Sequence, residues 1–171
     1  MCWLTEKIRS FFQTKKTGQD KKEPTKVIRP VPSHIQEGIE FGYKYPPEIA
    51  ELIGMEFHRG QDYLAPVGTP CFATKGSIVN VYDDVKYFGL YVVEKVVLEN
   101  VILYCYFCHL KEALVKIGDQ VESGQTIAYT GASGSATRLE GGNMVAHPHL
   151  HFEVRKNSRA SSAAVDPLGY M

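Results

Sequence analysis

Residues 147–154, HPHLHFEV, place three of the six histidines in the chain at alternate positions. In an extended segment, successive side chains point to opposite faces of the strand. The three histidines would therefore share one face, while Leu150, Phe152 and Val154 would share the other. The pattern predicts a strand with one face that packs against a core and one face that can coordinate a ligand.

Length and charge set the class of protein. A chain of 171 residues with 44% hydrophobic and 22% charged residues is typical of one globular domain, large enough to bury a core without disulfide bonds. The 19 basic and 19 acidic residues cancel. No global field therefore attracts the protein to nucleic acid or to an anionic surface, and we expect a partner to be recognised locally.

No stretch approaches the roughly 20 apolar residues of a transmembrane helix, and the N-terminus lacks the pattern of a secretory signal. We therefore expect no transmembrane segment, and delivery by another route if the protein works outside the cytoplasm. The four cysteines are too few and too irregularly spaced for a secreted disulfide framework, so free thiols are predicted. They are Cys2, Cys71, Cys105 and Cys108.

The first 26 residues differ from the remainder in composition and in the spacing of their apolar residues. Residues 1–12 are predicted to form a short amphipathic helix, because four apolar residues recur at helical spacing. They are Leu4, Ile8, Phe11 and Phe12. This helix could contact a membrane surface or a partner protein, or it could pack on its own domain. Residues 13–26 contain five lysines and no apolar residue, which is typical of a linker.

Residues 27–171 are predicted to form one all-β domain, because short runs rich in β-branched and aromatic residues are separated by turn signals. The expected strands cover residues 77–82, 90–98, 101–110, 126–130 and 150–155. The turn signals lie at residues 66–70, 99–100, 118–119 and 123–124. Residues 99–100 are expected to close a hairpin between two long strands.

Residues 58–62, HRGQD, set a histidine and a carboxylate four residues apart. In an extended stretch, His58 and Asp62 fall on the same face, and Gly60 between them has no side chain to crowd a site. Two histidines and an aspartate are a recurring donor set for catalytic zinc, which keeps a further position for water. HRGQD alone is weak support, and it gains weight from the motifs around it.

Several motifs occur in a fixed order along the chain. They are FGYK (41–44), HRGQD (58–62), GTPCFAT (68–74), KGSIV (75–79), CHL (108–110), VKIGDQVESGQTIAYTGASG (115–134), HLHFEV (149–154) and DPLGY (166–170). By these motifs and their order, the chain resembles the lysostaphin-type zinc endopeptidases, also called the β-lytic metallopeptidase family, from about residue 29 to its C-terminus. The resemblance implies a compact antiparallel β-sheet or β-sandwich domain with a groove over the sheet.

The resemblance also implies one zinc ion, a set of ligands and an activity. Carried over by position, the family pattern makes His58, Asp62 and His151 the zinc ligands, and it places His109 and His149 beside the metal as catalytic residues. The implied reaction is hydrolysis of an amide in peptidoglycan stem peptides or cross-bridges, with zinc activating water and polarising the carbonyl. The two unligated imidazoles would orient water, stabilise the oxyanion and pass a proton to the leaving amine.

Three alternatives compete with this interpretation. CYFCH (105–109) matches the haem-attachment motif, but residues three apart on a strand face opposite sides, so two packed thiols are favoured. The 115–128 run also resembles biotin or lipoyl carriers, yet no carrier lysine motif is present. A non-catalytic structural or binding module would typically lose one or more ligands, and this chain keeps every candidate.

Some features depart from the family pattern or stay open. His147 is expected to be a surface histidine rather than an accessory ligand. Phe107 stands where relatives often have tyrosine, so any hydroxyl there is absent. Residues 135–146 are expected to form a loop whose Arg138 either contacts a substrate carboxylate as part of a mobile groove wall or is simply solvated.

The implied place of action is the cell wall, outside the cell or in the periplasm. The absence of a visible signal and of a wall-binding module fits a phage lysin that is released at lysis or carried in the virion, with residues 1–26 tethering it to a virion protein. A bacterial enzyme with another export route is the alternative. The bond cut, the host and the oligomeric state are not encoded in the metal-site motifs.

Overall fold

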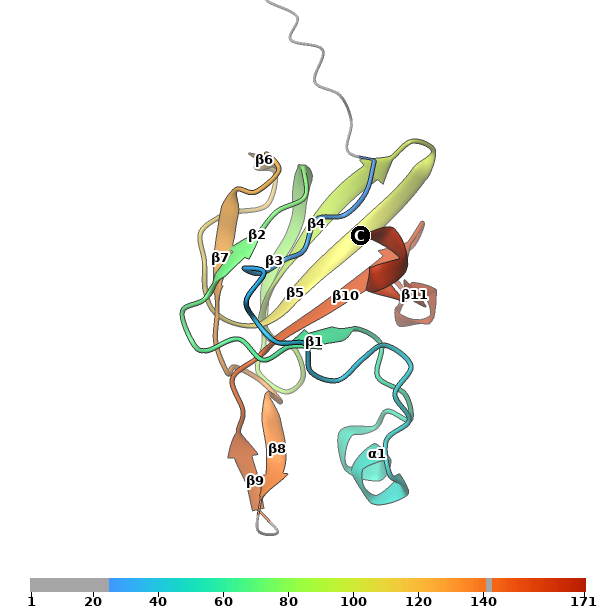
Figure 1. The fold of residues 1–171 in the computed structure, drawn as a ribbon, viewed down its shortest axis with the longest axis vertical. Helices are drawn as coiled ribbons and strands as arrows, with labels where there is room; N and C mark the ends of the chain where they lie inside the picture. The colour runs from blue at the N-terminus through green and yellow to red at the C-terminus, as the bar shows by residue number, and fades with distance from the viewer. Residues whose placement is uncertain (1–24, 141–142) are drawn as a thin grey trace, which may run out of the picture.

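The computed structural model describes residues 25–140 and 143–171 (Figure 1). Side chains are described for all of these residues except those within 138–144. The predicted N-terminal helix, residues 1–12, and residues 13–24 of the predicted linker lie outside this part of the chain. At the start of the described region, Val27 is buried, and its N–H donates to the carbonyl of Tyr170. This hydrogen bond ties the first described residues to the C-terminal end of the domain.

In the described part of the chain, nine strands form one antiparallel sheet, and two more form a separate hairpin. The main path runs β1-β10-β5-β4-β3-β6, with β11 beside β10, and with β7 joining β5 to β2. The strands of the sheet are β1 (Gln61–Tyr63), β2 (Pro70–Phe72), β3 (Gly76–Asp84), β4 (Gly89–Leu98), β5 (Val101–Ala113), β6 (Gln120–Val121), β7 (Thr126–Thr130), β10 (Leu150–Lys156) and β11 (Ala164–Val165). The prediction of an antiparallel all-β domain is confirmed.

All five strands predicted from the sequence are present, each within a few residues of its expected bounds. The hairpin at residues 99–100 is also confirmed, since Leu98 pairs with Val101 across the turn. The strands that were not predicted within the sheet, β1, β2, β6 and β11, have two or three residues. A run that short shows no alternation, so only its pairing with longer neighbours reveals it.

One short α-helix, α1 (Pro47–Ile53), was not expected from the sequence. Its start is favoured by proline in the first turn and by Glu48, whose charge suits a helix N-terminus. It ends at Gly54, which adopts the left-handed conformation at φ 66° and donates to the carbonyl of Ala50. Figure 1 shows α1 and the hairpin β8–β9 (Thr137–Glu140 and Asn143–Ala146) projecting at the same end of the sheet.

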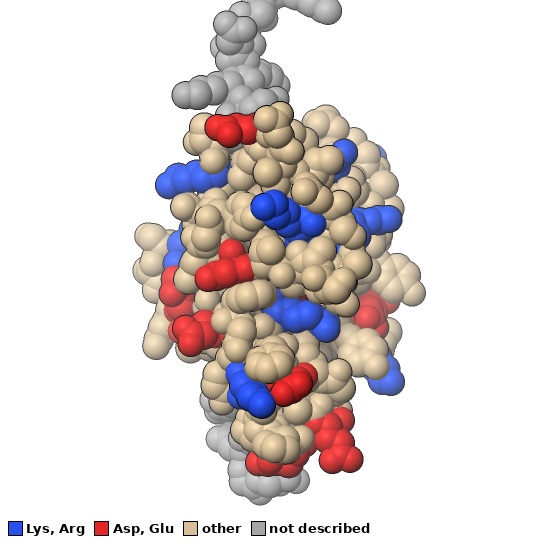
Figure 2. Space-filling model, turned by 90° about the vertical axis from the view of Figure 1, so that its right-hand side faces the viewer, with Lys and Arg blue, Asp and Glu red and all other residues tan. Residues whose placement is uncertain are grey.

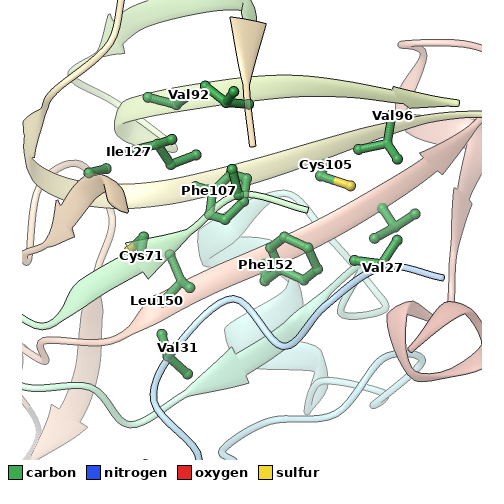
Figure 3. Packing of buried hydrophobic residues seen from close by; sticks show 14 of the residues in the cluster. Val27, Val31, Cys71, Val92, Val96, Cys105, Phe107, Ile127, Leu150 and Phe152 are labelled. Carbon is green, nitrogen blue, oxygen red and sulfur yellow. The ribbon is translucent and has the colours of Figure 1, made fainter. Parts of the chain in front are cut away.

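The hydrophobic core covers one face of the sheet (Figure 3). Phe107 of β5 and Phe152 of β10 pack edge to face with ring centroids 5.1 Å apart, and Leu150 and Val154 lie on the same face. Val27 and Val31, which lie in the segment before α1, pack against these strands in Figure 3. The predicted packing face of HPHLHFEV is therefore confirmed.

The opposite face of β10 carries His151, Glu153 and Arg155. In the ladder with β5, His151 pairs with Cys108 and Glu153 pairs with Tyr106, and directly paired residues share a face of the sheet. Cys105 instead belongs to the core on the other side. Cys105 and Cys108 are buried free thiols on opposite faces, which rules out their holding one haem together, and Cys71 is a third free thiol.

A bulge in β5 interrupts the alternation at His109. Val92 of β4 pairs with Phe107, but Leu90 pairs with Leu110, so one extra residue is accommodated between these pairs. His109 has φ 61°, in the left-handed region that residues with side chains rarely adopt. Phe107 and Leu110 both face the core, whereas the His109 ring lies beside His149 and His151.

The outer surface mixes both signs of charge, as Figure 2 shows for one face. This agrees with the balanced composition and with the absence of a global field. Within residues 25–140 and 143–171, no helix has the length and apolar character needed to cross a membrane.

Glu94 of β4 is a fully buried carboxyl whose oxygens accept hydrogen bonds from the backbone N–H groups of Thr74 and Lys75. Burial raises the pKa of Glu94 from 4.5 to about 7 despite these bonds. Because the folded-state pKa lies above the unfolded value, the stabilisation is complete below about pH 4.5 and is lost as the pH rises through about 7.

We therefore expect the metal-free wild-type protein to lose about 3 kcal/mol of unfolding free energy relative to Glu94→Gln between mildly acidic and mildly basic pH. Urea unfolding of both proteins across this range measures the difference. Parallel stability curves for the two proteins would contradict the assignment of this pKa to Glu94.

Candidate metal centre

Three donor atoms converge on the face of the sheet opposite the core. Asp62 of β1 pairs directly with His151 of β10, and His58 precedes β1 by three residues. The Oδ1 atom of Asp62 lies 3.0 Å from Nδ1 of His151 and 3.2 Å from Nε2 of His58. These two histidine nitrogens are 2.9 Å apart. The structure thus brings together all three residues predicted as ligands, and together they could hold a metal ion.

The donor set fits zinc in number and chemistry. Donors about 2.0–2.2 Å from a tetrahedral zinc ion lie roughly 3.3–3.6 Å apart, and the measured separations fall just below this range. Three protein donors also leave one position for water. Gly60 contributes by having no side chain, because a Cβ atom there would lie 2.7 Å from Cε1 of His151 and 2.6 Å from the carbonyl oxygen of Phe152.

The charges at the donor cluster are coupled. Burial alone would raise the pKa of Asp62, but hydrogen bonds from His151 and His58 hold it well below its usual range. Burial alone would lower the pKa of His151, yet the neighbouring Asp62 and Glu153 carboxylates raise it to about 9. In the metal-free protein at neutral pH, Asp62 is therefore ionised, and His151 is positively charged, with a proton on each ring nitrogen.

We expect zinc affinity to fall about tenfold per pH unit as the pH decreases below 9. A zinc ion held by His151 would need the lone pair of the imidazole, so its binding would displace one proton from His151 wherever the pH lies below its pKa. Competition with a chromogenic chelator near pH 8, 7 and 6 measures this slope. An affinity that does not change over this range would contradict proton displacement.

His109 and His149 flank the donor cluster with their ring centroids 4.7 Å apart. Nδ1 of His109 lies 2.9 Å from the carbonyl oxygen of Ser133, and Nδ1 of His149 lies 2.8 Å from that of His147. Because a carbonyl oxygen can only accept, each Nδ1 carries a proton and each neutral ring keeps a lone pair on Nε2. Nε2 of His149 lies 3.8 Å from Oδ1 of Asp62.

Both flanking histidines are neutral near pH 7. Burial, reinforced by the neighbouring His149 and His151, lowers the pKa of His109 to about 3. Burial also lowers the pKa of His149, although the Asp62 charge and the His147 carbonyl oppose this effect. The centre therefore holds two imidazoles that can accept a proton through Nε2 and then donate it.

The structure shows where three features lie whose roles the sequence left open: His147, Phe107 and residues 135–146. His147 is partly exposed and its ring lies 5.8 Å from that of His149, but its contribution is the carbonyl that orients His149. Phe107 faces the core and is 1% exposed, so a hydroxyl at this position would point away from the metal centre. The prediction of a loop at residues 135–146 is wrong, because residues 137–140 pair with residues 143–146 to form the hairpin β8–β9. The side chain of Arg138 lies outside the described part.

The groups that orient the imidazoles were not predicted from the sequence. Two are the carbonyls of Ser133 and His147, and a third is the carbonyl of Glu40, 3.0 Å from Nδ1 of His58. Backbone carbonyls leave no signal in the residue types. Glu153 was also missed, although it stands two residues after His151 on the same strand face, which the alternation of HLHFEV could have revealed.

Comparison with family models matches residues 56–167 to peptidase family M23. Peptidoglycan DD-endopeptidase ShyC of Vibrio cholerae is 37% identical over 107 residues, covering 60% of this chain and 22% of that protein. Lysostaphin of Staphylococcus simulans is 32% identical over 136 residues, covering 76% of this chain and 24% of that protein. The chain thus spans about a quarter or less of the length of these relatives.

Solved structures show the same fold. The catalytic domain of lysostaphin from Staphylococcus simulans is similar with a TM-score of 0.63 and 29% identity, covering 80% of this chain and 91% of that one. A zinc-containing peptidase from Vibrio cholerae is similar with a TM-score of 0.64 and 32% identity, covering 85% of this chain and 40% of that one.

Proposed function

This chain belongs to peptidase family M23, and we propose that it is a zinc-dependent endopeptidase that hydrolyses an amide bond in peptidoglycan stem peptides or cross-bridges. One observation carries the proposal. Two imidazoles and a carboxylate meet within 3.2 Å of one another, and two further neutral imidazoles lie beside them. The printed activities of ShyC and lysostaphin support the substrate class.

We propose that His58, Asp62 and His151 hold the zinc ion through Nε2, Oδ1 and Nδ1. Zinc, when bound, supplies a water of lowered pKa and polarises the scissile carbonyl. Burial of the three donors, each at most 6% exposed, keeps the centre at low effective dielectric. The ionised Asp62 would offset part of the metal charge, and in the metal-free protein its Oδ1 atom accepts hydrogen bonds that orient both histidine rings.

His109 and His149 are proposed to move the proton. Each presents an unprotonated Nε2 because its Nδ1–H is held by a backbone carbonyl, so each can accept a proton from attacking water. The same nitrogen, once protonated, can stabilise the oxyanion and donate to the leaving amine. The fixed rings avoid a reorientation during the reaction.

The test is digestion of purified peptidoglycan from two kinds of wall, one cross-linked through diaminopimelate and one through glycine bridges. Mass spectrometry of the products identifies the bond that is cut. We expect soluble fragments with a new amino terminus, and none after zinc is removed with a chelator. Failure of the zinc-loaded protein to cut either wall would favour the alternative, a non-catalytic module that binds through the same fold.

We also propose that the enzyme acts on the cell wall in a phage setting, as a lysin released at lysis or carried in the virion. The amphipathic spacing within residues 1–12 and the lysine-rich segment 13–26 support a tether to a virion protein. Copurification of a tagged 1–26 segment with a virion protein would test this tether, and a partner of cellular origin would contradict it.

A further inference from the structure

Glu153 is a completely buried carboxylate on β10, two residues after His151 and on the same face of the sheet. Its Oε1 atom accepts a hydrogen bond of 2.6 Å from Nε of Arg155. Its Oε2 atom has no hydrogen-bond partner among the described residues and lies 3.6 Å from Nε2 of His151. Burying a carboxylate with one unpaired oxygen costs folding free energy unless that oxygen faces a hydrogen-bond donor or a positive charge.

The His151 ring presents its two nitrogens to different carboxylates. Nδ1 faces Oδ1 of Asp62 at 3.0 Å and Nε2 of His58 at 2.9 Å, which is the donor cluster. Nε2 faces Glu153. A carboxylate beside an imidazole nitrogen favours the proton on that nitrogen. With a metal ion held by Asp62, that carboxylate would no longer be free to accept the Nδ1 proton, so Glu153 would keep the ring proton on Nε2 and leave the lone pair on Nδ1.

We propose that Glu153 is a positioning residue for the metal centre: it keeps the proton of His151 on Nε2 and thereby presents the Nδ1 lone pair to the metal. The inference rests on the proposed zinc site. Among the described residues, the contact between Glu153 and the donor cluster is the one to Nε2 of His151, so Glu153 acts through that ring rather than as a ligand.

Arg155 occupies the Oε1 atom of Glu153 and so fixes the direction in which Oε2 points. Its guanidinium donates to the Oε1 atom of Glu153, to the hydroxyl of Tyr106 and to the carbonyl of Arg159. It also stacks over the Tyr106 ring, 4.0 Å from its centroid. With three acceptors and an aromatic ring around it, Arg155 fixes the direction of the carboxylate and balances its charge.

Packing holds the His151 ring in the orientation that this contact requires. The ring of Phe88 stacks on it with centroids 6.0 Å apart and an interplanar angle of 19°. Gly60 leaves space on another side, where a Cβ atom would lie 2.7 Å from Cε1 of His151. The ring has little freedom to rotate, so its tautomer decides which nitrogen offers a lone pair.

The test is the zinc affinity of Glu153→Gln, measured by competition with a chromogenic chelator. We expect binding about 10- to 100-fold weaker than in the wild type, because the charge that stabilises the bound tautomer is lost while the shape is kept. Glu94→Gln is the matched control, since Glu94 is the other fully buried glutamate in the described part of the chain and lies away from the donor cluster. Its zinc affinity should equal that of the wild type.

A second measurement does not depend on the folding of a variant. Long-range ¹H–¹⁵N correlation spectra of the zinc-loaded wild type should show a proton on Nε2 of His151 and none on Nδ1. Equal zinc affinity of wild type and Glu153→Gln, or a proton absent from Nε2, would overturn the inference. Because neither readout uses hydrolysis, a loss of the positioning role is distinguishable from a failure of the proposed peptidase activity.

Discussion

Asp62→Asn is expected to reduce peptidoglycan hydrolysis at least about a thousandfold and to leave the purified protein with little zinc. The amide keeps the size of the carboxylate but removes the charge that both histidines contact at 3.0 and 3.2 Å. Loss of metal activation is worth several kcal/mol of barrier, and about 4 kcal/mol corresponds to a thousandfold. Release of soluble fragments and metal analysis of the same sample give both quantities.

The control for Asp62→Asn is Asp83→Asn in β3. Asp83 is exposed and stands on a different strand, so its loss of charge should leave both hydrolysis and zinc content unchanged. Full hydrolytic activity in a zinc-free Asp62→Asn sample would contradict the proposed metal centre. Circular dichroism of both variants checks that the sheet is intact.

Gly60→Ala is expected to weaken zinc binding at least about a hundredfold and to abolish hydrolysis. The added Cβ would meet the carbonyl oxygen of Phe152 at 2.6 Å and the His151 ring at 2.7 and 2.9 Å, distances that real Cβ atoms essentially never show. Either β1 or the ligand ring must move, and displaced ligands or their supports typically cost 10- to 100-fold each in affinity. The chelator competition and the hydrolysis assay measure the two effects.

Gly169→Ala is the matched control, because a Cβ at Gly169 meets no atom within 4 Å and the residue does not have positive φ. It should bind zinc and hydrolyse substrate like the wild type. Wild-type zinc affinity in Gly60→Ala would show that the site tolerates the added methyl group, against the close approach seen here.

The sequence was sufficient to predict most of the fold and the three residues, His58, Asp62 and His151, that the structure brings together. The long strands were visible because alternation and turn residues are local properties of the chain, and β3, β4, β5, β7 and β10 all formed as expected. The grouping of His58 and Asp62 followed from spacing and from the family motifs. What spacing could not show was that β1 pairs with β10, which puts Asp62 directly opposite His151.

The amino-acid sequence by itself determined an antiparallel sheet with a packing face and a histidine face, because period-two patterning depends only on neighbouring residues. Tertiary structure alone decided the placement of His109. Strict alternation would have sent this side chain into the core with Phe107, and a bulge with φ 61° turns it to the opposite face instead. Pairing of β5 with β4 and β7 determines this backbone conformation, so the bulge could not be predicted from a local sequence pattern.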